Sequence, residues 1–240
     1  IRDQPRSRGL GDVYKRQCGI RDGYYDFSAA HILSSVDDSL RRLQAEYIDL
    51  LLLHRPDALM DVEEVADTLH QLQRTGKVRR FGVSNFTSAQ IELLQSVCKV
   101  PIQVNQMQFG LMHAGMIQQG LEANMLTDGA ASRDMAVLDY CRLHNITIQA
   151  WSPLQYGFFE GSFIDNEKFP EVNDVLGRIA EERHVTKSAI AIAWILRHPA
   201  QMQVLAGTMN PEHLVQLCEA VNIILSRKEW YELYRAAGYI

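Results

Sequence analysis

Segments typical of β-strands alternate with segments typical of α-helices along this 240-residue chain, and this alternation constrains its fold more than any other feature. Strand-like apolar runs begin near residues 47, 78, 102, 146 and 203, and a segment with helical periodicity follows each of them. Strict alternation of this kind predicts parallel strands joined by right-handed crossovers. We therefore expect an α/β fold, which is either a (β/α)8 barrel or a doubly wound sheet.

Capping residues and apolar spacing predict the boundaries of these elements. Ser28 can cap a helix that carries Ile32 and Val36, the run 47–53 is typical of a parallel strand buried on both faces, and Gly76 can end the next helix. The other expected elements are helices at 61–75, 87–97, 134–143, 172–183, 187–197 and 227–236, a helix that begins at 210–211, strands at 78–83, 102–107, 146–150 and 203–206, and long loops at 110–132 and 155–170.

The charge of the chain is uneven, and this divides it into two parts. The formal net charge is −5, which argues against nucleic acid as the main partner. Residues 1–17 carry a net charge of +3, and the remaining 223 residues carry −8. A basic arm for nucleic acid or for an acidic membrane surface is one interpretation. The string RSRGLGDVYKRQ resembles translated adapter sequence at the ends of assembled metagenomic reads, so we interpret 1–17 as a non-native leader and 18–240 as one partial domain.

Cysteine spacing and hydropathy indicate the cellular compartment. The four cysteines are scattered without a CxxC pair, which is typical of reduced thiols and offers neither a disulfide framework nor a metal site. No apolar run approaches the roughly 20 residues that span a bilayer. We therefore expect a cytoplasmic protein with no bound metal and no membrane partner.

Polar or stacking side chains lie at or near the C-terminal ends of all five predicted strands. In parallel α/β folds the C-terminal ends of the strands form the site. No GxGxxG motif follows the first strand, so this sequence lacks the phosphate-binding loop that a Rossmann fold would have. The predicted site residues at the strand ends are His54, Ser84 with Asn85, Asn105 with Gln106, Trp151 with Ser152, and Gly207 with Thr208.

Across residues 18–240 the sequence resembles the aldo-keto reductases, most closely their bacterial oxidoreductase branch. The resemblance rests on the order and spacing of five strings: DxSLxRLxxxYIDLLLLHRPD at 37–57, GKVRRFGVSNF at 76–86, QVNQMQF at 103–109, AWSPL at 150–154 and GTMNPEHL at 207–214. It implies a (β/α)8 barrel, here incomplete because the first two βα units are missing and the third is damaged. It also implies an enzyme that reduces aldehydes or ketones, its small-molecule carbonyl substrates, to alcohols with NAD(P)H.

The resemblance assigns roles to residues at the first four strand ends. His54 corresponds to the active-site histidine that polarises the substrate carbonyl. Ser84, Asn85 and Gln106 correspond to the residues that bind the nicotinamide carboxamide. Trp151 corresponds to the aromatic residue that stacks on the nicotinamide ring, although a tryptophan at this position can also be a core residue. Ser152 and Leu154 fall where the family contacts the pyrophosphate.

The segment 207–216 corresponds to the part of the family that binds the adenosine 2′-phosphate. Gly207, Thr208 and the helix that opens at Asn210 can bind this group, because a helix N-terminus offers free N–H groups and a favourable dipole. Three neighbouring positions depart from the family pattern: Gly207 replaces a common lysine, His213 a common arginine and Gln216 a common glutamate. We expect NADPH as the cofactor, with NADH as the alternative.

The largest departure concerns the catalytic groups other than His54. The family's proton-donating tyrosine and its aspartate have no counterparts, and Gln17 stands where a lysine is expected. Tyr14 and Lys15 belong to the suspected leader, so neither receives a catalytic role. A positioned general acid contributes about 10²–10⁴-fold to rate. We therefore expect the chain as written to reduce no aldehyde and, with unpaired strand edges, to aggregate.

Two other functions are open at this stage. One is a cofactor-binding regulatory subunit of the same fold, like the channel-associated β subunits. The other is a binding module in which the basic leader is native. For a reductase, the long loops would determine the substrate. Apolar side chains there form either a pocket wall or simple loop packing: Met112, Met116, Met125, Tyr156, Phe158, Phe159 and Phe163.

Overall fold

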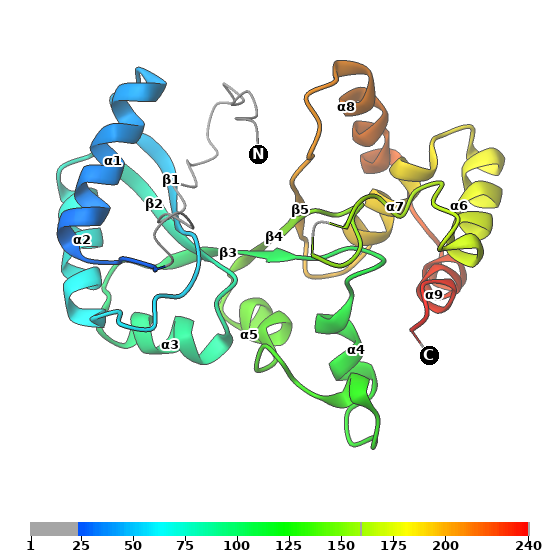
Figure 1. Ribbon diagram of the computed structural model, residues 1–240, viewed down its shortest axis with the longest axis horizontal. Coiled ribbons are helices and arrows are strands. Elements are labelled where there is room, and N and C mark those ends of the chain that lie inside the picture. Colours follow the sequence, from blue (N-terminus) through cyan, green and yellow to red (C-terminus); the bar gives the residue numbers. More distant parts are fainter. Residues whose placement is uncertain (1–23, 159, 240) are drawn as a thin grey trace. The chain divides into compact units, whose positions relative to one another are not determined.

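The computed structural model describes residues 24–158 and 160–239 and divides into two compact units, which are presented separately (Figure 1). Unit 1 extends to Gln106 and includes 143–146, and unit 2 comprises 107–142 and 147–240. The suspected leader at 1–17 and the third-strand remnant at 18–20 lie outside the described residues. No described helix is both long and apolar enough to cross a bilayer.

Unit 1 contains three parallel strands in the order β1, β2, β3, with a helix before or after each strand. Its strands are β1 Ile48–Leu53, β2 Val78–Ser84 and β3 Ile102–Gln108, whose last two residues belong to unit 2, and its helices are α1 Ala29–Leu43, α2 Val62–Arg74 and α3 Ser88–Val97. Its core includes Leu69, Phe81, Phe86 and Ile91, which have almost no exposed surface. The expected alternation and the parallel pairing are confirmed.

Unit 2 contains a second parallel pair, β4 Thr147–Trp151 and β5 Gln203–Val204, surrounded by helices. An aromatic stack forms much of its core: the rings of Trp194 and Trp230 are 4.8 Å apart, and Tyr234 and Phe109 lie against them. The helices of this unit are α4 Gly115–Leu121, η1 Asp128–Ala130, α5 Val137–Leu143, α6 Pro170–Arg183, α7 Lys187–Leu196, α8 Pro211–Cys218, η2 Glu219–Asn222 and α9 Arg227–Ala236.

The expected helix starts are confirmed where a side chain caps the helix. Ser28, Asp61 and Asn210 each accept a hydrogen bond from a backbone N–H of the first turn. Thr87 with Gln90 and Ser226 with Glu229 form capping boxes. Gly76 follows α2 with a φ of 75°, which is the conformation expected of a helix-ending glycine.

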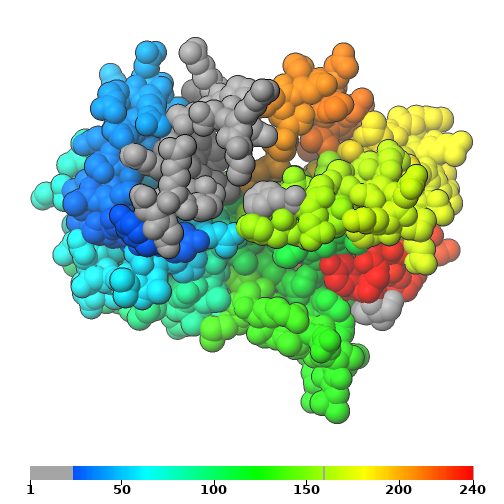
Figure 2. Space-filling model, in the orientation of Figure 1, coloured from blue at the N-terminus to red at the C-terminus, as the bar shows by residue number. Residues whose placement is uncertain are grey.

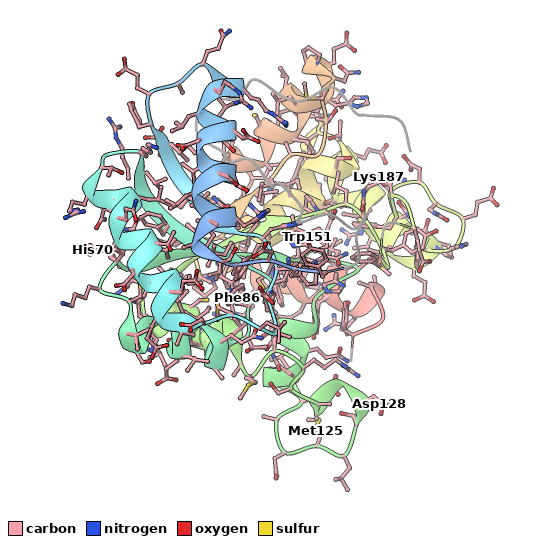
Figure 3. The ribbon with its side chains drawn as sticks, turned by 60° about the vertical axis from the view of Figure 1, so that its left-hand side comes forward. His70, Phe86, Met125, Asp128, Trp151 and Lys187 are labelled. Atoms are coloured by element: carbon pink, nitrogen blue, oxygen red, sulfur yellow. The ribbon has the colours of Figure 1, made fainter. Side chains whose placement is uncertain are left out.

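The structure corrects four expectations about the elements. The segment 110–132 is not an unbroken loop, because it contains α4 and η1, and these project from unit 2 with Met125 and Asp128 near the tip (Figures 2 and 3). Strand β5 has two residues rather than four. Helix α5 begins three residues later than expected, because Asp134 accepts a hydrogen bond from the N–H of Val137. Strand β1 is buried on both faces only at its end, at Leu52 and Leu53, whereas Leu50 and Leu51 are half-buried.

A glycine at the centre of β2 allows the strands of unit 1 to approach each other closely. A Cβ on Gly82 would lie 2.6 Å from Leu52 Cδ2 and 2.7 Å from the Val104 carbonyl oxygen, which is too close for any real side chain. The φ of Gly82 is not positive, so the constraint is one of space rather than of backbone conformation.

We expect Gly82→Ala to lower the free energy of unfolding by ~1–3 kcal/mol, because the added methyl group overpacks the sheet. Gly115→Ala is the matched control, since a Cβ there meets nothing within 4 Å. Urea unfolding followed by far-ultraviolet circular dichroism measures both variants. Equal midpoints for the two variants would contradict the packing argument.

A partly buried ion pair joins α6 to α9 in unit 2. Arg183 Nη2 lies 2.6 Å from Glu229 Oε1, and the other carboxylate oxygen accepts a hydrogen bond from the Ser226 N–H. Burial raises the pKa of the Glu229 carboxyl, but the hydrogen bonds from Arg183 and Ser226 outweigh this and lower the pKa to about 2. The charged form of Glu229 therefore stabilises the folded state.

Because the folded pKa lies below the ordinary value of 4.5, this stabilisation is complete above that pH and is lost as the pH falls toward 2. We expect Glu229→Gln to lower stability by roughly 1–2 kcal/mol at neutral pH and to flatten the pH dependence in this window. Glu182→Gln, in the exposed pair with Arg178, is the control. Urea unfolding at several pH values, followed by tryptophan fluorescence, measures the difference. An unchanged pH dependence of stability in Glu229→Gln would contradict the stabilising role of the Glu229 carboxylate.

Candidate active site

In unit 1 a hydrogen-bonded cluster joins the ends of β1 and β2 to Gln106, two residues before the end of β3. The Gln106 carbonyl accepts hydrogen bonds from the Ser84 hydroxyl at 2.9 Å and from the Asn85 N–H at 3.0 Å. The Asn85 side-chain amide donates to Ser84 Oγ at 2.9 Å and to the His54 carbonyl at 3.4 Å. Of the five predicted site residues of this unit, the cluster therefore joins Ser84 and Asn85 to the backbone carbonyls of His54 and Gln106.

The backbone at Asn85 turns sharply between β2 and the start of α3. Its φ is +60°, in the left-handed region that asparagine tolerates better than most residues. The capping box of Thr87 and Gln90 then starts α3 two residues later. This turn holds the Asn85 amide beside the end of β1, while Ser84 stays fully buried at the end of β2.

Asn105, the neighbour of Gln106, has a supporting position. Its side-chain amide donates to the Phe86 carbonyl at 2.9 Å, on the far side of the Asn85 turn. Asn105 has no exposed surface, and its Oδ1 has no hydrogen-bond partner within the described part of the chain. Asn105 thus fixes the backbone that presents Asn85. The sequence located Asn105 at a strand end but gave no sign of this role.

In unit 2 the end of β4 continues into a tight turn at 151–155. Trp151 is the last residue of β4 and is only half-buried, and its carbonyl accepts a hydrogen bond from the Phe109 N–H at 3.4 Å. Ser152 has a φ of +49°, and its carbonyl accepts a hydrogen bond from the Gln155 N–H. Gly110 packs so closely on Pro153 that a Cβ there would collide with the Pro153 carbonyl. The half-exposed Trp151, Ser152 and Leu154 therefore lie on a firmly packed turn.

The segment after β5 leads to the exposed N-terminus of α8. Thr208 Oγ1 accepts a hydrogen bond from the Asn210 N–H at 3.1 Å, and Asn210 Oδ1 accepts one from the Glu212 N–H at 2.9 Å. Gly207 and His213 are exposed, and Gln216 is half-buried. No residue of α8 is fully buried, and Figure 2 shows this helix at the surface of unit 2. The predicted phosphate-binding residues 207–216 therefore form one accessible segment.

The apolar residues of the long loops do not behave as one group. Phe163 and Met116 are buried, whereas Phe158 and Met125 are largely exposed and Phe159 lies outside the described residues. The Phe163 carbonyl accepts a hydrogen bond from the Asn173 side-chain amide, which fixes this part of the loop to α6. Loop packing therefore explains Phe163 and Met116 without a substrate pocket.

Residues 17–237 match the aldo/keto reductase family. The chain belongs to this family. It is 36% identical over 223 residues to a 6-dehydroglucose reductase of Agrobacterium fabrum, a match that covers 92% of this chain and 68% of the relative. It is 34% identical to the oxidoreductase YdhF of Escherichia coli, with 90% and 67% covered. This aldo/keto reductase chain thus spans about two thirds of the length of these relatives.

The fold of this aldo/keto reductase chain matches solved structures of the family. A Klebsiella pneumoniae aldo/keto reductase in complex with NADP and acetate superimposes with a TM-score of 0.67 at 26% identity, over 87% of this chain and 65% of that one. The α/β fold predicted from the sequence is confirmed. Five parallel strands are consistent with an incomplete (β/α)8 barrel.

Proposed function

We propose that this chain binds NADPH at the C-terminal ends of its strands and that it is part of an enzyme that reduces aldehydes or ketones to alcohols. The observation that carries the proposal is the cluster of Ser84, Asn85 and Gln106, which connects three neighbouring strands through hydrogen bonds. Side-chain amides and a hydroxyl are suitable partners for a nicotinamide carboxamide, which both donates and accepts hydrogen bonds. Asn85 and Gln106 supply side-chain amides of this kind, and the Ser84 hydroxyl is bonded to the Gln106 carbonyl.

The family resemblance assigns each part of the cofactor to a different group of the predicted residues. Asn85 and Gln106 would orient the carboxamide, and the half-exposed indole of Trp151 would offer its face to the nicotinamide ring. Ser152 and Leu154 would contact the pyrophosphate. Gly207, Thr208 and the N-terminus of α8 at Asn210 would receive the adenosine phosphate, flanked by His213 and Gln216. Bound NADPH supplies the hydride that reduces the carbonyl carbon.

His54 is the catalytic residue in this proposal. An imidazole N–H can donate a hydrogen bond to the substrate carbonyl oxygen and stabilise the negative charge that develops there. His54 lies at the end of β1, and the amide of Asn85 holds its backbone carbonyl. Histidine alone does not replace a dedicated proton donor, so we expect the 240-residue chain to bind NADPH with little or no turnover. A cytoplasmic location stays a prediction.

We expect NADPH to quench the tryptophan fluorescence of the chain in a saturable way, and Asn85→Ala to weaken the affinity about tenfold through loss of an amide contact. The chain is assayed fused to a soluble carrier protein, and Gln73→Ala, an exposed position of α2, is the control. Absence of saturable quenching, or an unchanged affinity in Asn85→Ala, would overturn the proposed cofactor site.

The same samples test turnover. We expect oxidation of NADPH with 4-nitrobenzaldehyde to stay at background. A rate above background that is lost in His54→Ala would show that the chain carries a full catalytic apparatus and would contradict the expected inactivity. Binding without turnover also fits the regulatory-subunit alternative. Adding the part of a relative that this chain does not span separates the two, because only a reductase would then oxidise NADPH with the aldehyde.

Gly207 gives a direct test of the phosphate-binding segment. This residue is exposed, its φ is not positive, and a Cβ there meets nothing within 4 Å, so a longer side chain can be accommodated. We expect Gly207→Lys to tighten NADPH binding about tenfold without changing NADH binding, because the added cation can pair with the 2′-phosphate. Gly115→Lys adds the same charge elsewhere in unit 2 and is the control. Equal gains for NADPH and NADH, or the same gain in Gly115→Lys, would refute this assignment.

A further inference from the structure

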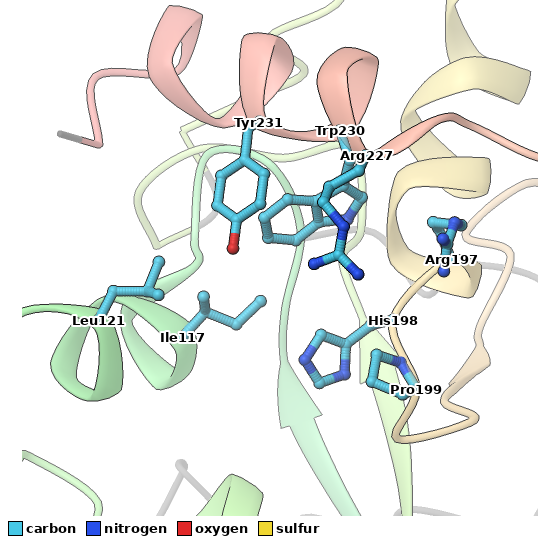
Figure 4. Close-up of a pocket in the computed structure, with 8 residues that line it drawn as sticks. All are labelled: Ile117, Leu121, Arg197, His198, Pro199, Arg227, Trp230 and Tyr231. Atoms are coloured by element: carbon cyan, nitrogen blue, oxygen red, sulfur yellow. The ribbon is translucent and has the colours of Figure 1, made fainter.

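Unit 2 contains a pocket of about 380 Å³ that the proposed function does not use (Figure 4). The pocket lies between α4, the segment that follows α7, and the start of α9. His198 and Pro199 line it just before β5 begins, whereas the candidate phosphate-binding residues follow the other end of β5. Its volume is in the range of small-molecule sites, roughly 300–1,000 Å³.

The floor of the pocket is apolar and held rigidly. Ile117 and Trp230 are buried, and Leu121 is partly exposed at the edge. The indole N–H of Trp230 donates to the Trp194 carbonyl at 3.0 Å, and the indole N–H of Trp194 donates to the Trp230 carbonyl at 3.1 Å. These reciprocal bonds and the ring stacking fix Trp230, so the pocket is preformed rather than created by a ligand.

The rim of the pocket is cationic. Arg197 and Arg227 line it, and no aspartate or glutamate does within the described residues. Arg183 and Arg178, elsewhere in the same unit, pair with glutamates, whereas neither rim arginine forms an ion pair in the described part of the chain. Arg197 is held by a hydrogen bond from its Nε to the Leu225 carbonyl at 2.8 Å.

Of the two arginines, Arg227 has the position that more strongly indicates a bound anion. It is the first residue of α9, where the positive end of the helix dipole disfavours a cation. The positive charge of Arg227 does not stabilise the helix, but it would stabilise an anion bound in the pocket. Figure 4 shows its guanidinium directed from α9 toward His198, and the Tyr231 hydroxyl directed toward Ile117 and Leu121.

His198 adds a neutral hydrogen-bonding group to the same rim. Burial, and next the charge of Arg142, lower the pKa of His198, while Asp139 opposes this shift. The imidazole is therefore neutral at neutral pH. Its Nδ1 accepts a hydrogen bond from the Ala200 N–H at 3.2 Å, which places the remaining proton on Nε2 and makes that atom a donor.

We propose that this pocket binds a small aromatic anion, with its ring on the apolar floor and its carboxylate or sulfonate on the guanidinium of Arg227. An aromatic ring matches the buried surface of Trp230 and Ile117. A planar oxyanion matches the fork of N–H donors that arginine presents. An uncharged ligand would form no ion pair with the cationic rim, and a simple anion would make no apolar contact with the floor.

Two probes with the same aromatic skeleton test the proposal. 8-Anilinonaphthalene-1-sulfonate carries the anion and N-phenyl-1-naphthylamine lacks it, and the fluorescence of both increases in apolar surroundings. The full chain on its carrier protein is titrated with each probe. We expect the sulfonate to bind more tightly than the amine, and benzoate to displace it.

Variants identify the residue that binds the anion. We expect Arg227→Gln to weaken binding of the sulfonate about tenfold and to leave binding of the neutral amine unchanged. Arg235→Gln, an exposed arginine near the other end of α9, is the matched control. Leu121→Asp, which places a carboxylate at the edge of the pocket, provides a second variant with the same expected direction.

Circular dichroism verifies that each variant is folded. Equal affinity of Arg227→Gln and Arg235→Gln for the sulfonate would overturn the proposal. Binding of the neutral amine as tight as that of the sulfonate would overturn it as well, because the pocket would then be merely apolar.

Discussion

The register between β2 and β3 determines the candidate active site of unit 1. Phe81 pairs with Ile102, but Gly82 pairs with Val104, so one residue of β3, Gln103, is passed over. Without this bulge Ser84 would lie opposite Asn105, and with it Ser84 lies opposite Gln106. A shift of one residue exchanges the two faces of a strand, so the bulge decides that the carbonyl of Gln106, rather than that of Asn105, accepts the hydrogen bonds from Ser84 and Asn85. The missing side chain of Gly82 allows the close approach at this point.

Local sequence was sufficient to predict the start of a helix that is capped by its own side chain. It was insufficient where a residue distant in the sequence determines the boundary of an element. Ser28 and Asn210 cap helices with their own side chains, so both helix starts were predictable. Helix α4 has no such cap. Its preceding Ala114 N–H instead donates to the hydroxyl of Tyr239, which is 125 residues away in the sequence, and no local pattern reveals that bond. The length of β5 likewise depends on its pairing with β4, which local periodicity does not report.

The same limit applies to the candidate site. The rule that functional residues lie at strand ends applied equally to Asn105 and Gln106. Only the bulge gives them different roles: Asn105 donates to the Phe86 carbonyl, and the Gln106 carbonyl accepts from Ser84 and Asn85. The individual roles of these residues came from the family resemblance rather than from spacing. Residues at the ends of β4 and β5 were also located from the sequence, but the pocket at Arg227 was not. It is assembled from α4, residues 197–199 after α7, and α9, which are far apart in the sequence.

The aromatic core of unit 2 connects the two sites that this unit carries. Trp230, the floor of the pocket, stacks on Trp194, and Trp194 stacks on Phe109 with ring centres 5.6 Å apart. The Phe109 N–H donates to the carbonyl of Trp151, and the next residue, Gly110, contacts Pro153 in the turn of the proposed cofactor site. Because close-packed interiors have little free volume, a ligand that displaced Trp230 would have to move Trp194 or Phe109 as well. The rigidity that preforms the pocket therefore also fixes the turn that presents Trp151.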